Sequence, residues 1–295
     1  MSASERARYD DAARAASETV IASYSTSFSL AVRLLPPAQR ADVRAVYGLV
    51  RLADEIVDGA LDDVDPAARA ALLDDLEDEV ARARARGCST NLVVHAFTLA
   101  AARCSIGDDL TGPFFDAMRT DLVRDAHDAA SLATYVHGSA EVVGLMCLQI
   151  FAADLPTPER TRLVRDAAPG ACALGSAFQK VNFLRDLAED SGTLGRAYFP
   201  GLDDHELTEE RKIELVADIR QDLADAREVI ALLPISARIG VLAAAELFRE
   251  LTDRIDALPA AELSERRVSV PGPTKAVLLA RAAATAPRLT RSKGH

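Results

Sequence analysis

The sequence predicts an all-α protein that folds as a single domain, residues 1–295, and three observations support this prediction. Ala, Leu, Arg and Glu, which favour helices, dominate the composition together with Asp. The period-two alternation of β-branched residues that is typical of strands is almost absent. Proline and glycine interrupt the apolar stretches at intervals that suit helices joined by loops. We therefore expect a helical bundle.

The expected helices follow in order from this punctuation. They are residues 8–23, 38–60, 66–86, 90–104, 112–125, 131–152, 157–190, 208–232, 235–256 and 272–285. The breaks between them fall at Pro36-Pro37, Gly107, Pro156, Gly192–Gly195, Pro234 and Pro271-Gly272-Pro273. Gly138 and Gly144 lie inside an expected helix, where they cost stability unless close packing or a kink offsets the loss. The core is expected over residues 20–285, with frayed ends at 1–8 and 287–295.

Composition and charge limit the class of function. The formal charge is −11 and no basic stripe is present, which argues against a nucleic-acid partner. The N-terminus lacks an apolar signal core. No apolar run looks long enough to span a bilayer, and the best candidate, Val142–Ala153, is expected to be a buried helix. We expect a cytoplasmic protein whose thiols are reduced, because its cysteines show no disulfide framework or metal-ligand spacing. These are Cys88, Cys104, Cys147 and Cys172.

Two acidic motifs stand out because each lies in an otherwise apolar helical stretch. The first contains Asp54 and Asp58 after Arg51, and the second contains Asp186 and Asp190 after Arg185. Aspartates four residues apart share one helix face and repel each other, so a positive group is expected between them. Mg²⁺ suits carboxylate oxygens and leaves coordination positions for substrate phosphates.

The spacing alone is not specific, because other aspartate pairs in this acidic chain share it. These are Asp58/Asp62, Asp74/Asp78, Asp121/Asp125 and Asp218/Asp222. Most such pairs are solvated helix faces. The two chosen motifs differ because Arg, Tyr, Asn or Gln accompany them at helical offsets.

The two motifs are far apart along the chain, since Asp186 follows Asp54 by 132 residues. A bundle core can bring such carboxylates face to face. With bound metal ions they would hold a diphosphate leaving group, and Arg51, Arg185 and Arg196 could add charge-assisted hydrogen bonds. A charged mouth over an apolar interior suits a substrate with a diphosphate head and a hydrocarbon tail.

Several ordered motifs extend this pattern from Tyr24 to beyond Pro200. They are Ser25-Thr-Ser-Phe28, Leu34-Leu-Pro-Pro37, Tyr47–Asp58, Met118-Arg-Thr-Asp-Leu122, Tyr135–Gly144, Gln179–Asp190 and Arg196-Ala-Tyr-Phe-Pro200. In sequence and order these motifs resemble the squalene/phytoene synthase family. The resemblance implies an isoprenoid-synthase helical bundle with a central apolar cavity. It also implies head-to-head condensation of two prenyl diphosphates through a cyclopropyl diphosphate intermediate.

The resemblance further implies roles for individual residues. The expected ligands of Mg²⁺, or of Mn²⁺ as a substitute, are Asp54, Asp58, Asn182, Asp186 and Asp190. The expected catalytic set is Asp54, Asp58, Asp186, Asp190, Arg51, Arg185 and Tyr47. The expected substrate contacts are Tyr24, Ser25, Thr26, Ser27, Tyr47, Arg51, Gln179, Arg185, Arg196, Tyr198 and Phe248.

Three residues depart from the family pattern. Glu55 stands where many members have aspartate and keeps the charge. Glu141 replaces a glycine, and it needs a partner or a position at the polar rim. Phe248 replaces a substrate-contacting tyrosine of some relatives, so a stacking surface remains without the hydroxyl.

Other polar residues are assigned no committed role. For Asp121 and Asp125, a position lining the site and a structural ion pair stay open as alternatives. Lys180 and Lys275 are expected at the surface. Four histidines are expected to be mainly structural, namely His95, His127, His137 and His205.

The leading functional hypothesis is condensation of two geranylgeranyl diphosphates to phytoene. Two farnesyl diphosphates are the alternative, giving squalene, dehydrosqualene or presqualene diphosphate, and NADPH is needed only for squalene. A catalytically inactive scaffold relative is the alternative outside enzymology. The expected partners are prenyl diphosphates and, for the apolar product, transient contact with the inner face of a membrane or with a downstream isoprenoid enzyme.

Overall fold

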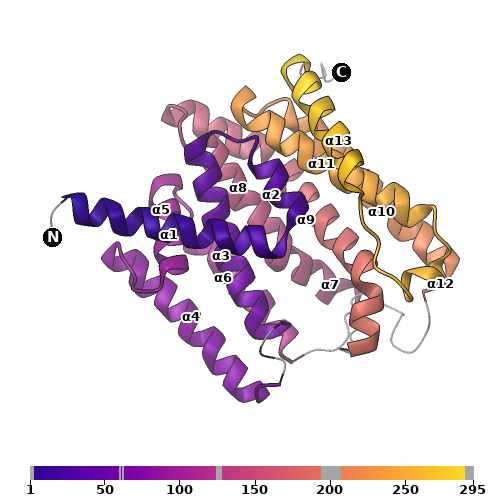
Figure 1. The fold of residues 1–295 in the computed structure, drawn as a ribbon, viewed down its shortest axis with the longest axis horizontal. Helices are drawn as coiled ribbons and strands as arrows, with labels where there is room; N and C mark the ends of the chain where they lie inside the picture. The colour runs from indigo at the N-terminus through magenta and orange to yellow at the C-terminus, as the bar shows by residue number, and fades with distance from the viewer. Residues whose placement is uncertain (1–2, 60, 62, 124–127, 194–206, 290–295) are drawn as a thin grey trace.

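The computed structural model describes residues 3–59, 61, 63–123, 128–193 and 207–289 (Figure 1). Over these residues the chain is helical and contains no strand, so the all-α prediction is confirmed. In chain order the α-helices are α1 (Ala3–Tyr24), α2 (Thr26–Val32), α3 (Pro37–Val57), α4 (Pro66–Arg86), α5 (Leu92–Cys104), α6 (Asp108–Asp121), α7 (Ala129–Val136), α8 (Val142–Ala152), α9 (Thr157–Thr193), α10 (Glu209–Ile230), α11 (Ile235–Asp256), α12 (Ala260–Leu263) and α13 (Gly272–Thr285). A π-helical turn, η1 (His137–Glu141), joins α7 to α8, and a 3₁₀ turn, η2 (Ala286–Arg288), follows α13.

Two short helices and the π turn were not predicted. Helix α2 has seven residues, and it begins where the Ser25 side chain accepts a hydrogen bond from the Phe28 amide at 3.2 Å. A helix of two turns gains little from intrinsic propensity, so its stability comes from packing, here against α1, α3 and α11. That packing is tertiary, and the local sequence does not encode it.

The N-terminal helix starts earlier than expected. Residues 1–8 were expected to fray, yet α1 begins at Ala3. Arg6 Nη2 donates to the carbonyl of Gly87 at 2.7 Å, and the Tyr9 hydroxyl donates to the carbonyl of Ser89 at 2.8 Å. These bonds connect α1 to the loop between α4 and α5. The fully buried His95 completes the contact through Nε2, which lies 2.8 Å from Asp10 Oδ1, so its role here is structural.

Helix α9 is the longest element, with 37 residues, and it crosses the middle of the molecule (Figure 1). It packs against α8, α10 and α11, while α3 packs against α1, α5 and α8. Glycines make the contact of α9 with α8 and η1 possible. A Cβ atom at Gly144 would lie 2.4 Å from the carbonyl oxygen of Ala171, and one at Gly175 would lie 2.5 Å from that of Ala140. The close packing expected around Gly144 is therefore present.

The segment from α7 to α8 requires a correction. No apolar run was expected to be long enough to span a bilayer, but the continuous helical run Ala130–Ala152 has 23 residues and a mean hydropathy of 1.2. By length and composition alone it could cross a membrane. In the structure 56% of its apolar window is buried inside the bundle, as is usual for a core helix of a globular protein.

One carboxyl group is buried in this core. Asp121, at the C-terminal end of α6, is 4% exposed, and its Oδ2 accepts a hydrogen bond from the Tyr135 hydroxyl at 2.9 Å. Burial raises its pKa to about 8, which the Tyr135 hydrogen bond opposes and the charge of Asp54 reinforces. Asp121 is therefore a buried carboxyl group that is hydrogen-bonded to Tyr135 and lies close enough to Asp54 for the two charges to interact.

We expect Gly144→Ala to lower the free energy of unfolding by about 1–3 kcal/mol, because the added methyl group meets backbone atoms of α9 that cannot rotate away. Urea denaturation followed by circular dichroism measures this change. Gly112→Ala is the control, since a Cβ atom there has no heavy atom within 4 Å. A Gly144 variant as stable as the Gly112 variant would contradict the close contact.

We expect Asp121→Asn to become progressively more stable than the wild type as the pH rises. A carboxyl group with a raised pKa stabilises the fold while it is protonated, and this contribution disappears between its unfolded pKa, about 4, and about 8 in the folded protein. The amide cannot ionise, so the difference should grow by on the order of 1 kcal/mol per pH unit. Urea denaturation at several pH values tests this, with Asp116→Asn on the same helix as control. A difference that does not change with pH would contradict the prediction.

Candidate active site

The first acidic motif occupies the last turns of α3. Arg51 forms an ion pair with Glu55, and its Nη1 lies 3.9 Å from Asp54 Oδ2. Asp58 is the C-terminal cap of α3, and its amide donates to the carbonyl of Asp54 at 2.8 Å. The helix therefore ends at the second aspartate, and the one arginine faces both neighbouring carboxylates.

Asp54 lies in a recess that solvent still reaches. Its side chain keeps 37% of its surface exposed, yet protein atoms enclose it closely enough that desolvation raises its pKa to about 6. The charge of Glu55 adds to this rise and that of Arg51 opposes it. A nearby cation would therefore stabilise the ionised form of this partly desolvated carboxyl group.

Residues of α1 and α2 cover this motif. The guanidinium carbon of Arg51 lies 4.2 Å from the centroid of the Tyr24 ring, which is a cation–π distance. Tyr47, one helical turn before Arg51, is mostly buried, and this burial raises its pKa. Asp54 reinforces the rise, whereas Arg51, a hydrogen bond with Ser25, and Arg185 lower it. Since the charge of Arg185 acts on Tyr47, the second motif lies within electrostatic range of the first.

The second acidic motif lies near the C-terminal end of α9. Two nitrogens of the Arg185 guanidinium group bind Asp186, with Nε 2.8 Å from Oδ1 and Nη2 paired to Oδ2. Arg267, from the chain between α12 and α13, adds a third contact, with Nε 3.0 Å from the same Oδ1. One turn earlier, the buried Oδ1 of Asn182 has no hydrogen-bond partner. Gln179 is half-buried on the same helix.

Aromatic rings from four helices form the apolar part of the site. Phe28 of α2 lies 5.4 Å from Phe178 of α9 and 5.6 Å from Phe248 of α11, between ring centroids. Phe178 and Phe248 stack with their centroids 3.8 Å apart, and Tyr47 lies 6.3 Å from Phe28. We call Phe28, Tyr47, Phe178 and Phe248 the aromatic cluster. It connects the two acidic motifs to the apolar core.

Some predicted residues lie outside the described part of the structure. The backbone of Asp190 is helical within α9, but its side chain is not described. The remaining ones are Arg196, Tyr198, Asp125, His127 and His205. The structure does not test their predicted roles.

The residues present fit a divalent metal ion. Asn182 Oδ1 is a buried oxygen with no hydrogen-bond partner, and Asp54 is a desolvated carboxyl, so both suit an oxygen-preferring cation. Among the side chains that the structure describes, no three carboxylate, imidazole or thiol groups converge closely enough to hold a metal. Arginines instead neutralise the acids, Arg51 on α3 and Arg185 with Arg267 at Asp186.

Several contacts near the site were not anticipated from sequence. Lys180, expected at the surface, is mostly buried and bridges Asp218 and Asp222 of α10. Lys275 Nζ donates to Thr26 Oγ1 at 2.9 Å. Glu141, which needed a partner, has one in His137, whose Nδ1 lies 2.9 Å from Glu141 Oε2. Arg267 carries no local sequence signal, because its partner Asp186 is distant in the chain.

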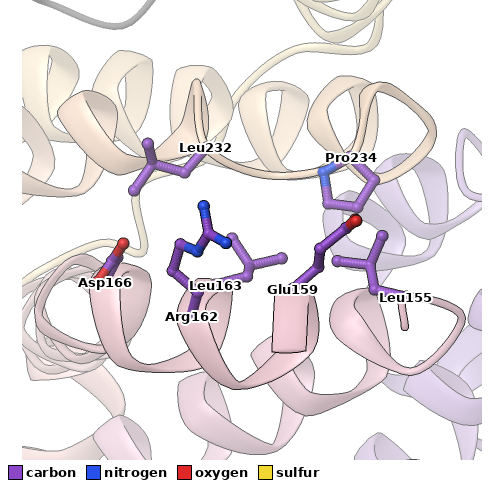
Figure 2. Close-up of a pocket in the computed structure, with 7 residues that line it drawn as sticks. All are labelled: Leu155, Glu159, Arg162, Leu163, Asp166, Leu232 and Pro234. Atoms are coloured by element: carbon purple, nitrogen blue, oxygen red, sulfur yellow. The ribbon is translucent and has the colours of Figure 1, made fainter. Parts of the chain in front are cut away.

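A separate surface pocket of about 260 Å³ lies elsewhere on α9 (Figure 2). It is lined by Leu155, Glu159, Arg162, Leu163, Asp166, Leu232 and Pro234. Asp166 precedes Asp186 by almost six helical turns, which corresponds to about 30 Å along the axis. This pocket is therefore not part of the acidic site.

Comparison with known proteins shows similarity to one family over most of the chain. A family model described as Squalene/phytoene synthase matches residues 21–274. A phytoene synthase of Arthrospira platensis is 30% identical over 260 residues, which cover 80% of this chain and 82% of that protein. The chloroplastic phytoene synthase 1 of Solanum lycopersicum is 28% identical over 255 residues, covering 81% of this chain but only 60% of its own length.

Solved structures share the fold. A dehydrosqualene synthase crystallised with a ligand superposes with a TM-score of 0.76 at 21% identity, covering 96% of this chain and 99% of that one. Squalene synthase HpnC from Alicyclobacillus acidocaldarius gives a TM-score of 0.68 at 22% identity, covering 87% and 95%. At these identities the likeness concerns the fold alone. Since the family model matches most of the chain, including both acidic motifs, the protein belongs to the squalene/phytoene synthase family.

Proposed function

We propose that this protein condenses two geranylgeranyl diphosphates head to head to give phytoene. The observation that carries the proposal is that the two arginine-bearing acidic motifs both lie near Tyr47, which is a member of the aromatic cluster. This arrangement provides a charged mouth for a diphosphate and an apolar interior for a tail. The two relatives described above are named phytoene synthases, which supports the longer substrate.

Mg²⁺ held by Asp54, Asp58, Asn182, Asp186 and Asp190 would neutralise the diphosphate and make it a better leaving group. The arginines of the chain do complementary work. Arg51 and Arg185 can donate charge-assisted hydrogen bonds to the diphosphate oxygens. Tyr24 holds the Arg51 guanidinium over its ring, which limits the orientations available to that donor.

The proposed reaction has two stages. In the first, the allylic C–O bond of one substrate breaks and the double bond of the second attacks the cation, and loss of a proton closes a cyclopropane. In the second, the remaining C–O bond breaks, the carbon skeleton rearranges and another proton leaves. Two C20 substrates thus give one C40 hydrocarbon, two diphosphates and two protons. The aromatic cluster excludes water from the cations, and the faces of its rings favour positive charge.

A C30 product is the second candidate. Phe178 and Phe248 lie in face-to-face contact, which narrows the space between α9 and α11 and favours a shorter tail. Two farnesyl diphosphates would then give dehydrosqualene, presqualene diphosphate or, with NADPH, squalene. We also propose a cytoplasmic location with transient contact to a membrane or a downstream enzyme, because the product is apolar.

We expect purified protein with Mg²⁺ and geranylgeranyl diphosphate to form phytoene, identified by mass spectrometry of the extracted hydrocarbons. Parallel reactions contain farnesyl diphosphate with and without NADPH. A C30 hydrocarbon would preserve the condensation and change the substrate. If neither substrate reacts with Mg²⁺ or Mn²⁺, the inactive scaffold relative becomes the better description.

We expect Asp54→Asn and Asp186→Asn each to lower kcat/KM by on the order of 10²–10³-fold, because each removes a charge that acts on the leaving group. Asp78→Asn is the matched control, since Asp78 belongs to an aspartate pair of the same spacing and its side chain is 74% exposed. Turnover is measured by diphosphate release. Full activity in both active-site variants would refute the assignment of the acidic motifs.

A further inference from the structure

The chain between α12 and α13 lies against the active site. We call residues 264–271 the C-terminal strap, which Figure 1 shows as an extended segment leading into α13. Arg267 of the strap contacts Asp186 on α9, and Lys275, in the first turn of α13, contacts Thr26 on α2. Val268 and Val270 are buried, at 8% and 7% exposure, so they hold the strap against the core.

A buried lysine fixes the segment that precedes the strap. Lys212 of α10 is 1% exposed, and its Nζ donates to the carbonyls of Asp256, at 3.2 Å, and Leu258. Glu209 pairs with Lys212 and accepts a hydrogen bond from the amide of Ala260 at 2.9 Å. These contacts tie α12 to α10. Arg267 therefore reaches Asp186 from a point anchored independently of the acidic motif.

Two guanidinium groups contact the Asp186 carboxylate, which is more positive charge than is needed to neutralise it. Arg185 already binds both of its oxygens, and Arg267 shares Oδ1 with Arg185 Nε. The Arg267 side chain is 51% exposed, so its ion pair with Asp186 is solvated and adds little to overall stability. Such a contact is easily exchanged when another cation approaches the same oxygen.

We propose that Arg267 is a displaceable counter-ion of Asp186, which pairs with this carboxylate in the metal-free protein and leaves when a divalent cation binds, while the buried valines keep the strap on the core. The inference rests on the proposed metal site. A cation at Oδ1 would face the guanidinium at short range, so the two compete for the same carboxylate. Metal binding is thereby coupled to release of Arg267 and to local loosening of the strap around it.

The test is metal affinity in the absence of substrate. We expect Arg267→Gln to raise the affinity for Mn²⁺, measured by electron paramagnetic resonance, and for Mg²⁺, measured by competition, by about three- to tenfold. Arg267→Lys should stay closer to the wild type because it keeps the charge. Arg266→Gln is the matched control, since it removes the same charge from the neighbouring residue, which pairs instead with Glu262.

Hydrogen–deuterium exchange supplies a second readout. In the wild type, saturating Mg²⁺ should increase exchange of the amides in residues 264–271, whereas in Arg267→Gln exchange there should be high with or without the ion. Equal metal affinity in Arg267→Gln and Arg266→Gln, or strap exchange that Mg²⁺ does not change, would overturn the inference and leave the proposed metal site standing. A wild type that binds neither ion would overturn both.

Discussion

Neutralisation of acidic groups in a partly desolvated site is the constraint on which the active-site architecture depends. Asp54 of α3 and Asp186 of α9 belong to one site, and like charges brought together away from bulk water oppose its formation. Each motif resolves the conflict with its own arginine, placed on the same helix within one turn. Because Arg51 serves two carboxylates and Asp186 has two guanidinium groups, the charges balance across the pair of helices rather than within each one. The arginines and the expected metal ligands are therefore parts of one electrostatic unit.

The orientation of α9 is set by contacts on its other sides. Lys180 and Ser176 both reach Asp222 of α10, at 2.8 Å each, while Gly175 brings the helix against the η1 turn. These contacts fix the rotation of α9 about its own axis, and with it the direction in which Asn182 and Asp186 point. A π-helical turn beside this contact shifts the register of the following helix, and such turns are frequent at functional sites. The polar network of α9 thus has a positioning role that its surface-like sequence conceals.

Sequence patterns were sufficient where the physical cause is local. The helix expected at 235–256 is α11, Ile235–Asp256, because Pro234 starts it and apolar periodicity continues it. The pairing of Arg51 with Asp54 and Glu55 was predictable for the same reason, since residues three and four apart on a helix are neighbours, whereas Arg185 pairs with the adjacent Asp186. Helix α2 was missed because its packing, rather than its propensity, stabilises it. Arg267 was missed because it meets Asp186 only after α10 to α12 have folded back along α9. Lys180 appeared to be a surface residue because its partners lie on another helix.

The stacked rings of Phe178 and Phe248 have a thermodynamic consequence for ligand selection. Rings in face-to-face contact leave no gap for a polyisoprenoid between them, so an arriving tail has to separate them and take over the surface that each ring now gives the other. Contact between the two rings is then replaced by contact between each ring and the tail. Because the ring faces were already buried against each other, the apolar area newly removed from water is smaller than the length of the tail suggests. The part of a tail that reaches these rings should therefore add less to affinity than its apolar area suggests, whereas the contribution of the headgroup is not reduced. A short analogue that keeps the diphosphate would then compete well with a full-length chain.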